Sequence, residues 1–541
     1  MKKLPVGVQT FQKIIEGGYV YADKTRHIYD LATQGQYFFL SRPRRFGKSL
    51  LVDTMKEAFS GNRALFSGLD LGETDFDFTP SPVIRLDMSA LDNTTPENLR
   101  LGISSALTDI AATYGVQAED PVPATQLRRL IEGLRAATGR HVTVLIDEYD
   151  KPIIDHLHEP SVAENNRVEL RSLYGVLKAT DAHLRFVFLT GVSKFTRLSL
   201  FSQLNNLSDI TLNPRFATIC GFTETDFGIL FSDRLENLSA TRRARGLPDA
   251  DPVALRDRIF TWYDGYSWDG ANRVFNPFSL LRFFQDEVFF PYWYTSGVPQ
   301  FLVGTLRRDP VQYAQLEGAT ITEVDLDSHE IERAPLISLL FQTGFLTVTS
   351  VDLSYEPLVY ELGFPNLEVS QSFSGWYLDT IAADSPVTAQ SWAVRVRRAL
   401  DQGNPDELEG LLGGLFASIP YQLHRNSEAL YHAVFLATMT FLGFRMLGEV
   451  SVAGGRIDGT IDTSSGKAYV VEMKYVPCGD DADPAEIDRV LGLGVADALA
   501  QIEAKRYADA YQGTGKTVFN VGIAVTGRGI VKVQSTPPAP H

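Results

Sequence analysis

The sequence has little cysteine, no long hydrophobic run and no excess of positive charge. Its two cysteines, Cys220 and Cys478, lie far apart and form no CxxC pair. This excludes a disulfide framework and a zinc knuckle, and it suits a reducing cytosol. No run reaches the roughly 18 apolar residues of a membrane-spanning helix. Pro5, Gln9 and Gln12 interrupt any signal-peptide core, so we expect a cytoplasmic protein without a membrane partner.

The charge of the chain limits how it can meet nucleic acid. The net charge is −16 over 541 residues, so the mean field of the protein repels a polyanion. Any contact with DNA or RNA must therefore use a local basic surface. The hydrophobic content of 44% is that of a globular protein. At this length we expect about three domains rather than one core.

The stretch Phe38–Val52 (FFLSRPRRFGKSLLV) predicts a phosphate-binding loop. A buried, aromatic strand runs into a short irregular segment, and Gly47-Lys48-Ser49 then opens a helix. Strand, tight loop, GK[ST] and helix is the layout of a P-loop. The free N–H groups and the dipole of the helix start favour an anion there. Lys48 supplies a positive charge for the outer phosphates, and the Ser49 hydroxyl can ligate Mg²⁺.

The loop departs from the usual pattern at its first position. Arg42 stands where a P-loop has glycine, and Arg44 and Arg45 crowd a loop that is usually small. The alternative is a basic loop before an ordinary helix. A second acidic signal is needed to decide between the two.

A second signal follows at Val142–Ile146 (VTVLI). This apolar strand ends in Asp147 and Glu148, which is the Walker B arrangement. Ligands of parallel sheets sit beyond the carboxyl ends of such strands. Asp147 would hold Mg²⁺ through water, and Glu148 would orient and deprotonate the attacking water. The alternative is a strand stopped by a charged turn.

A further buried strand at Phe186–Thr190 ends in polar residues. Thr190 or Ser193 is a candidate sensor of the γ-phosphate, and Lys194 or Arg197 a candidate for neutralising transition-state charge. The alternative, that these residues only satisfy backbone groups of a loop, stays open.

Several sequence motifs of the chain resemble those of a known family. Its motifs are RPRRFGKSLL, LIDEYDKP, LTGVSKFTRLSLFSQLNNL, ICGFTETDF and WYDGYSWDG…VFNPFSLL. They are similar to the AAA-ATPase-like domain of bacterial and archaeal proteins that also carry a PD-(D/E)XK nuclease domain. In that family RPRRFGKS is the usual form of the loop. The resemblance implies a P-loop ATPase with an additional strand and a catalytic glutamate. The nucleotide-binding residues are then Arg44, Arg45, Phe46, Gly47, Lys48, Ser49, Leu50, Asp147 and Thr190, with Ser49 and Asp147 at the metal.

A second chemical centre lies near the C-terminus. A helix at Ser427–Phe441 is apolar nearly all round, so we expect it to be buried. Strands are predicted at 444–452, 456–462 and 467–475. Asp458 lies on the second strand and Glu472-Met473-Lys474 on the third. A helix followed by a three-stranded meander that carries Asp458 and Glu472 is the arrangement of the PD-(D/E)XK core.

The spacing of these residues has a physical reason. Side chains alternate along a strand, so Glu472 and Lys474 share a face. Asp458 and Glu472 can therefore converge on one Mg²⁺, and Lys474 can position the water that attacks a phosphodiester. The alternative is that Glu and Lys simply alternate on an exposed strand. The otherwise apolar composition of the strand disfavours this alternative, because it indicates a buried strand, and buried charges need partners.

The pattern ExxYH…LGF…E…GRID…VVEMK…AxxQIxxKxY also resembles the C-terminal nuclease domain of the same family. By that resemblance the active-site positions are Glu428, Asp458, Glu472, Lys474 and Gln501, with Asp458 and Glu472 at the metal. Ile457 replaces the usual proline, a common departure. We therefore expect an intact nuclease site.

The expected fold class is α/β. The predicted domains are a P-loop AAA-ATPase-like domain with a parallel sheet flanked by helices (1–215), a helical lid (216–300), a connector that resembles a winged helix (301–394), a restriction-endonuclease-like α/β domain (395–534) and a disordered tail (535–541). In the lid we expect the aromatic residues to form core rather than base-stacking platforms.

The first functional hypothesis is an ATP-regulated, Mg²⁺-dependent nuclease that acts on nucleic acid, with DNA expected ahead of RNA. The alternative is an ATP-dependent switch whose nuclease-like domain only binds nucleic acid or a protein partner. A non-enzymatic scaffold is disfavoured because both motifs are intact. Whether the protein forms a homo-oligomer is left open.

Overall fold

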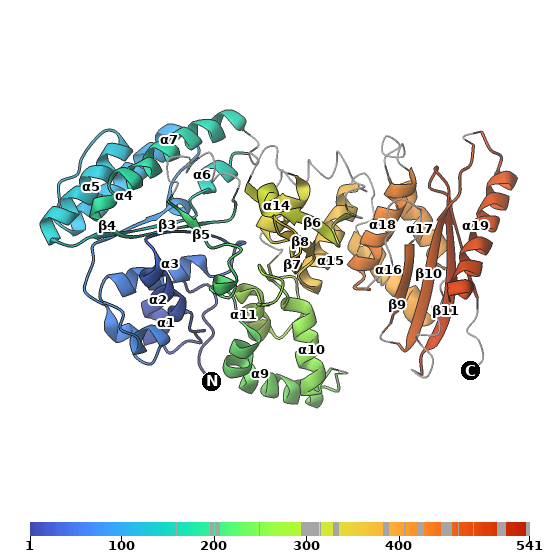
Figure 1. The fold of residues 1–541 in the computed structure, drawn as a ribbon. Helices are drawn as coiled ribbons and strands as arrows, with labels where there is room; N and C mark the ends of the chain where they lie inside the picture. Colours follow the sequence, from blue (N-terminus) through green and yellow to red (C-terminus); the bar gives the residue numbers. More distant parts are fainter. Residues whose placement is uncertain are drawn as a thin grey trace. The chain divides into compact units, whose positions relative to one another are not determined.

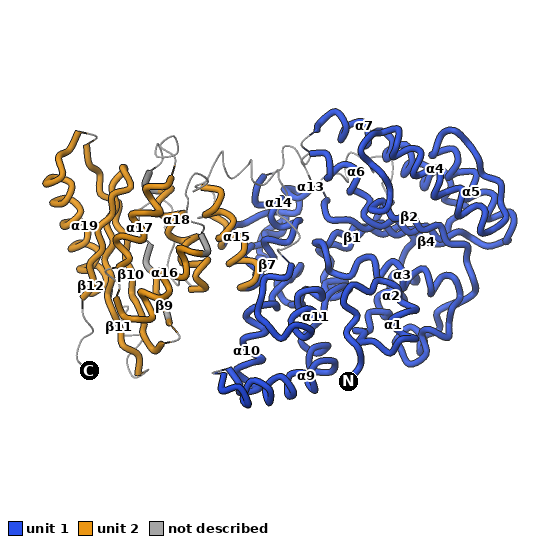
Figure 2. The backbone as a smooth tube through the Cα atoms, turned by 180° about the vertical axis from the view of Figure 1, so that it is seen from behind, with its two compact units in different colours: residues 1–296, 318–366 blue, residues 297–317, 367–541 orange. Residues whose placement is uncertain are grey.

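The computed structural model places the described residues in two compact units, each packed around its own interior (Figure 2). Unit 1 holds residues 1–296 and 318–366, and unit 2 holds residues 297–317 and 367–541. Among the described residues, no helix is long and apolar enough to cross a membrane. The structure describes residues 1–157, 159–194, 200, 206–247, 249–293, 313, 315–327, 335–381, 389–404, 407–419, 427–444, 457–463, 465–479, 481–505 and 515–536.

Unit 1 contains a parallel five-stranded sheet with the strand order β2-β3-β4-β1-β5 (Figure 1). Its strands are β1 (Tyr37–Ser41), β2 (Val83–Asp87), β3 (Val142–Asp147), β4 (Leu184–Gly191) and β5 (Ser208–Asp209). Strand β4 lies between β1, which leads into the P-loop, and β3, which ends in the acidic pair. The sheet therefore has the additional strand that the sequence predicts, and the expected α/β class is confirmed.

Helices cover both faces of this sheet, which explains why its strands are almost entirely apolar. Helices α1, α2 and α3 lie on one face and α4, α5 and α7 on the other (Figures 1 and 2). On the second face, Leu99, Leu130 and Leu173 from the helices share one core with Ile84 and Val144 from the strands. The helices are α1 (Phe11–Glu16), α2 (Thr25–Gln34), α3 (Lys48–Phe59), α4 (Pro96–Thr113), α5 (Pro123–Thr138), α6 (Lys151–Ile154) and α7 (Pro160–Ala179).

The lid consists of α9 (Glu224–Ala244), α10 (Pro252–Tyr263) and α11 (Pro277–Asp286). Most of its aromatic residues are core, as predicted, because Tyr263, Tyr266, Trp268 and Phe275 are buried, whereas Phe278 is only half-buried. Arg242 and Arg243 lie in the last turn of α9. Arg242 is paired there with Asp249.

A small antiparallel sheet with the order β6-β8-β7 completes unit 1. Its elements are β6 (Ala319–Thr322), α13 (Glu323–Asp327), α14 (Leu336–Thr343), β7 (Thr347–Asp352) and β8 (Val359–Gly363). Helix α14 ends at Gly344, and β7 and β8 then pair as an antiparallel hairpin. The winged-helix-like connector stays a prediction.

Unit 2 holds a four-stranded sheet with the order β12-β11-β10-β9. Strands β10 and β11 are parallel, and the other two pairs are antiparallel. Helix α19 packs along one face and α16 and α17 lie on the other (Figures 1 and 2). The elements are α15 (Leu367–Ile381), α16 (Ala389–Gln402), α17 (Glu407–Ala417), α18 (Ser427–Phe441), β9 (Ile457–Asp462), β10 (Lys467–Tyr475), α19 (Pro484–Lys505), β11 (Thr517–Val525) and β12 (Val531–Thr536).

Two predicted segments of unit 2 are a strand at 444–452 and a disordered tail from residue 535. The strand predicted at 444–452 lies outside the described residues beyond 444. The tail predicted from residue 535 is wrong at its start, because Ser535 and Thr536 are paired with β11 in the last strand. Backbone pairing outweighs the loop-like composition of these two residues.

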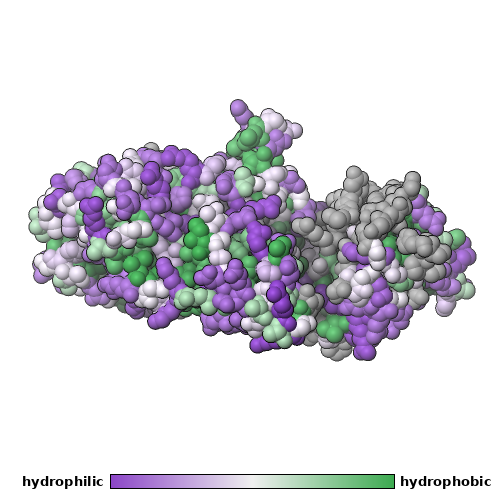
Figure 3. Space-filling view, turned by 90° about the horizontal axis from the view of Figure 1, so that it is seen from below, coloured by the Kyte–Doolittle hydropathy of each residue, from purple (hydrophilic) through white to green (hydrophobic). Residues whose placement is uncertain are grey.

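The visible face of unit 1 in Figure 3 is mostly polar, with separate, smaller hydrophobic patches. Exposed apolar residues such as Leu101 and Ile229 lie on different helices. Isolated exposed apolar side chains are normal on soluble surfaces and indicate no docking site by themselves.

Candidate functional sites

The P-loop turns from strand to helix through two residues with left-handed backbone. Arg45 has φ 67° and Gly47 has φ 90°, and Lys48 begins α3. Glycine adopts this conformation without steric cost, whereas it is uncommon for arginine. The turn leaves the first N–H groups of α3 at the mouth of the loop, where they can bind phosphate.

The side chain of Lys48 is buried within the phosphate-binding loop. Its side chain is 3% exposed and its Nζ lies 3.5 Å from Oε1 of Glu148. The ammonium also donates to the carbonyl oxygens of Arg42 (3.0 Å) and Pro43 (3.1 Å). The ammonium thus has two carbonyl acceptors and one nearby carboxylate but no tight ion pair. It is therefore available to neutralise a phosphate.

Arg42 does not crowd the phosphate site, because its side chain lies in the interior of unit 1. The guanidinium donates to the carbonyls of Ser41 (2.9 Å), Thr211 (2.9 Å) and Phe216 (3.1 Å). It stacks 3.9 Å from the ring centre of Trp268 in the lid. Burial lowers the pKa of Arg42 to about 10, which still leaves it charged at neutral pH. The position usually held by glycine thus serves as a structural link to the lid.

Asp147 has the properties of a metal-binding carboxylate. It is fully buried, and within the described part of the chain neither of its oxygens has a hydrogen-bond partner. Burial raises the pKa of this carboxyl, while the nearby Ser49 hydroxyl and Lys48 ammonium lower it. An unpartnered buried carboxylate is costly unless a cation completes it. Asp147 and Ser49 together therefore fit a hydrated Mg²⁺.

Glu148 stands at the edge of the same site. Its backbone is left-handed, with φ 53°, and its side chain is 20% exposed. It lines the cleft next to Lys48. A partly exposed carboxylate that lines the cleft can reach an attacking water molecule, whereas the buried Asp147 does not line the cleft. This division fits the roles that the sequence predicts for the two acids.

The candidate sensor residues separate into different environments. Thr190 is fully buried, and its hydroxyl has no hydrogen-bond partner among the described residues. Ser193 donates to Asp150 instead. Lys194 is buried and lies 3.0 Å from Asp209 on β5, which favours a structural role. Arg197 lies outside the described residues.

A cleft of about 500 Å³ opens in front of the P-loop. Besides Arg44–Leu51, its lining includes the N-terminal segment, the Cys220–Phe222 turn and the start of α11. Sequence reasoning missed three charged residues of this cleft, Lys24, Asp87 and Lys151. Asp87 is adjacent to Asp147 in the parallel register of β2 and β3. Its position at a strand end was the available signal.

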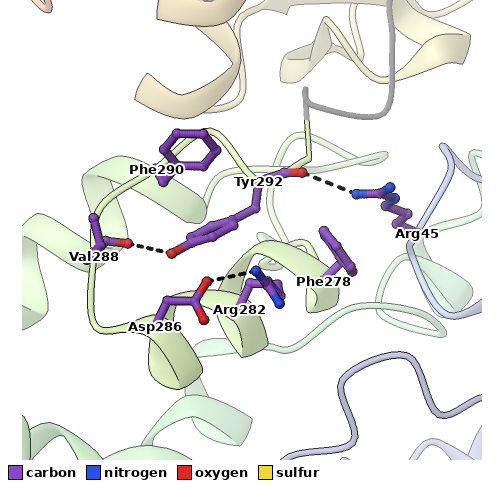
Figure 4. A pocket seen from close by; sticks show the side chains of 7 residues that line it. All are labelled: Arg45, Phe278, Arg282, Asp286, Val288, Phe290 and Tyr292. Atoms are coloured by element: carbon purple, nitrogen blue, oxygen red, sulfur yellow. Dashed lines mark hydrogen bonds and ion pairs between the residues drawn. The ribbon is translucent and has the colours of Figure 1, made fainter.

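Two predicted nucleotide-binding side chains contact the lid. Figure 4 shows Arg45 at a second hollow, of about 380 Å³, where it stacks 4.0 Å from the Phe278 ring centre. Arg45 also donates to the carbonyl of Tyr292 (3.2 Å). Phe46 is buried, with ring centres 4.7 Å from Tyr266 and 5.4 Å from Trp268. Arg44 is exposed, and Leu50 lines the cleft.

The nuclease-like site is built on two strands of unit 2. Residue Asp458 on β9 is directly opposite Glu472 on β10 in the antiparallel register. Glu472 is 1% exposed, and its Oε2 has no hydrogen-bond partner among the described residues. Lys474 donates to Oε1 of Glu472 (3.0 Å) and to the Gln501 side chain on α19. The side chains of Asp458 and Glu428 lie outside the described residues.

Two further residues, missed by sequence reasoning, lie near Lys474. Asp497 on α19 approaches its Nζ at 3.8 Å. His432 on α18 is buried, and burial lowers its pKa to about 4, with Lys474 adding to the effect. Because Glu472 is buried with one unpartnered oxygen beside a lysine, the described residues fit a divalent cation at the position that the sequence predicts.

Comparison with known proteins finds a family model for each of the two regions that hold these residues. A family model described as a predicted AAA-ATPase matches residues 5–201, and a model of the PD-(D/E)XK nuclease superfamily matches residues 426–535. A protein of Azotobacter chroococcum mcd 1, described as an uncharacterized protein in the vnfD 5′ region, is 37% identical over 528 residues. The match covers 96% of each chain. This chain therefore belongs to the family that joins a predicted AAA-ATPase domain to a PD-(D/E)XK nuclease superfamily domain.

Proposed function

We propose that the protein is an ATP-binding and ATP-hydrolysing, Mg²⁺-dependent nuclease in which the nucleotide regulates phosphodiester cleavage. The observation that supports the proposal is that each unit holds a buried carboxylate with an unpartnered oxygen near a lysine, which is buried in unit 1 and partly buried in unit 2. In unit 1 these are Asp147 and Lys48, and in unit 2 they are Glu472 and Lys474. Two such pairs at the two motif positions support two magnesium sites.

The cleft of unit 1 supports ATP over GTP. Its described lining has carboxylates only at the phosphate end, namely Asp87 and Glu148. Guanine presents two adjacent N–H donors, which a carboxylate satisfies best. The part of the cleft away from the P-loop is lined mainly by apolar residues such as Val8, Ile219 and Phe222. Such a surface suits the flat face of adenine.

In the proposed ATPase reaction, a water oxygen bonds to the γ-phosphorus and the bond to the β,γ-bridging oxygen breaks. Glu148 accepts the proton of the water, and Lys48 neutralises charge on the outer phosphates. Bound Mg²⁺, held by Ser49 and Asp147, would supply further charge neutralisation. The buried Thr190 hydroxyl is the proposed γ-phosphate sensor.

In the proposed nuclease reaction, a water oxygen bonds to the scissile phosphorus and the bond from that phosphorus to one bridging oxygen breaks. The water releases a proton, and the leaving oxygen takes up a proton from solvent. Asp458 and Glu472 would hold Mg²⁺, which would lower the pKa of the attacking water. Lys474 orients that water, and Gln501 holds the lysine. Glu428 is a further proposed carboxylate of this site. We also propose the domain boundaries given above, a cytoplasmic location and DNA as the substrate ahead of RNA.

The test is a substrate matrix of plasmid, linear duplex, single-stranded DNA and RNA, each with and without ATP and Mg²⁺. We expect cleavage that needs Mg²⁺, changes with ATP and is lost in Glu472→Ala. ATP turnover should be lost in Lys48→Ala. The matched controls are Glu486→Ala on α19 and Lys56→Ala on α3, because both side chains are charged and lie outside the sites.

Two results would contradict the proposal. Full cleavage by Glu472→Ala would point to a contaminating nuclease. Lys48-dependent ATP turnover without cleavage of any polymer would favour a nucleotide switch whose nuclease-like domain only binds nucleic acid or a protein.

A further inference from the structure

The turn that carries Glu148 needs an external restraint. Glu148 is one of only three non-glycine residues with positive φ in the described chain. This conformation costs roughly 1–2 kcal/mol for an ordinary residue and persists only where surrounding contacts impose it. The contacts made by the residues that follow Glu148 therefore determine where its carboxylate lies.

Asp150 supplies the main restraint. Its carboxylate is fully buried, and Oδ2 accepts the Ser193 N–H (2.6 Å) and the Ser193 hydroxyl (2.8 Å). The Val192 N–H also donates to it, at 3.2 Å from Oδ2. Burial raises the pKa of Asp150 to about 6, and Glu148 adds to the rise, while these hydrogen bonds lower it. One carboxylate thus holds the backbone that leaves β4.

Tyr149 strengthens the same connection. Its N–H donates to the Thr190 carbonyl (3.0 Å), and its hydroxyl donates to the Ser193 carbonyl (2.8 Å). From α7, the Tyr174 hydroxyl donates to the Tyr149 carbonyl (3.1 Å). The residues on either side of the Glu148 turn are therefore fixed to the strand end that carries Thr190.

Gly191 shows how close this contact is. A Cβ at this position would lie 2.4 Å from Oδ1 of Asp150 and 2.5 Å from the ring of Tyr149. Neither distance is tolerated by real side chains. Only glycine lets the acidic turn and the end of β4 pack directly against each other.

We propose that Asp150 is a positioning residue of the ATPase site, which fixes Glu148, in the turn after β3, relative to Thr190 on β4. The inference rests on the proposed ATP hydrolysis. Asp150 does not line the cleft, so it acts through Glu148 and Thr190 rather than on the nucleotide. Loss of the restraint lets Glu148 move by a fraction of an ångström or more, which lowers turnover without changing the surfaces that bind ATP.

The test compares Asp150→Asn with the wild-type full-length protein. Asparagine keeps the size of the side chain but presents an amide group that cannot accept all of these donors. We expect kcat for ATP to fall about 10- to 100-fold, with nucleotide affinity, measured with a fluorescent ATP analogue, within about twofold. Ser193→Ala removes one donor and keeps its backbone N–H, so its kcat should fall about threefold.

The matched control is Asp264→Asn, because Asp264 is a half-buried acid whose pKa is also raised by burial to about 6, and it does not line the cleft. Its kcat should stay near the wild-type value. Absence of turnover in the wild type would refute the proposed ATPase itself. Wild-type kcat in a folded Asp150→Asn protein, or equal losses in kcat and affinity, would overturn the positioning role. If Asp150→Asn does not fold, Ser193→Ala decides, and an unchanged kcat rejects the inference.

Discussion

The role of Arg42 in the structure differs from the role that the loop pattern indicates for its position. By pattern it occupies a glycine position of a phosphate-binding loop, whereas in the structure its guanidinium holds three carbonyl groups together under Trp268. A charged donor bound to carbonyls is worth more than a neutral one, and each buried carbonyl left unpaired costs further free energy. The side chain is therefore a structural component of the fold.

We predict that Arg42→Gly, which restores the common pattern, does not improve ATP binding. It should lower the free energy of unfolding of unit 1 by about 3 kcal/mol, because it removes charge-assisted hydrogen bonds and a cation–π contact. Urea unfolding measures the loss. Arg26→Gly on α2 is a weaker control, since Arg26 is exposed and pairs only within its helix. Equal stability of the Arg42→Gly and wild-type proteins would contradict this role.

The buried His432, near Lys474 in the nuclease-like site, should make the stability of unit 2 depend on pH. Its folded-state pKa is lowered to about 4 from the ordinary 6.5, so the imidazole stays neutral in the folded state. Between these two values the unfolded chain binds a proton that the folded protein does not bind. The stability contributed by the neutral histidine is therefore complete above about pH 6.5 and is lost as the pH falls toward 4.

We predict that unit 2 loses up to about 3 kcal/mol of stability from this group between pH 6.5 and pH 4. His432→Asn cannot titrate, so the stability difference between wild type and variant should shrink as the pH falls. Urea unfolding at several pH values measures this. His183→Asn serves as the control, because the His183 side chain lies in an exposed 3-10 turn. A difference that is constant with pH would refute the assignment.

At the scale of elements, the sequence predicts best where burial leaves an unambiguous pattern. The strand expected at Phe186–Thr190 lies within β4, because both faces of a parallel strand are covered and its residues are apolar up to Thr190. The two-residue strand β5 could not be predicted, since Ser208 and Asp209 carry no apolar signal. The charged residues of the cleft, such as Lys151, also have no local pattern, because tertiary packing brings them to the P-loop.

The P-loop is supported from its outer side by the lid and by α14. The Trp293 indole N–H donates to the Arg44 carbonyl (3.2 Å), and Phe46 packs against lid aromatics. At the end of α14, Gly344 has φ 91°, and a Cβ there would lie 2.7 Å from the Pro43 side chain. These contacts join loop, lid and connector into one support for the phosphate site.

We predict that Gly344→Ala lowers both stability and ATP affinity. A left-handed alanine costs about 1–2 kcal/mol, and the clash with Pro43 should displace the P-loop. Gly139→Ala is a matched control, because Gly139 also ends a helix with positive φ but its Cβ would have nothing within 4 Å. Both variants should lose stability, and only Gly344→Ala should bind ATP several-fold more weakly. Equal affinities, measured by calorimetry, would show that α14 does not support the loop.

At the scale of the whole molecule, the units do not follow the order of the chain. Residues 297–317 belong to unit 2, and residues 318–366 return to unit 1. Sequence reasoning assumed continuous segments, and no composition change marks this crossing. What the sequence could predict was the presence of two chemical centres, because each depends on a short motif within one sheet.

Each unit has its own core, and each proposed ligand site lies within one unit, so ligand binding provides a test of the whole molecule. A ligand that binds only the folded state stabilises it by about 2.7 kcal/mol at 100 times its dissociation constant. We predict that Mg²⁺-ATP gives this increase for the amides of β1, β3 and β4. The amides of β10 and β11 should gain less, because they belong to unit 2 and the proposed ATP site lies in unit 1. Hydrogen exchange at rising urea concentrations measures both sets in one sample. Lys48→Ala should abolish the increase in unit 1, whereas Glu486→Ala should keep it. An equal increase in both sets would mean that the two units unfold as one cooperative body.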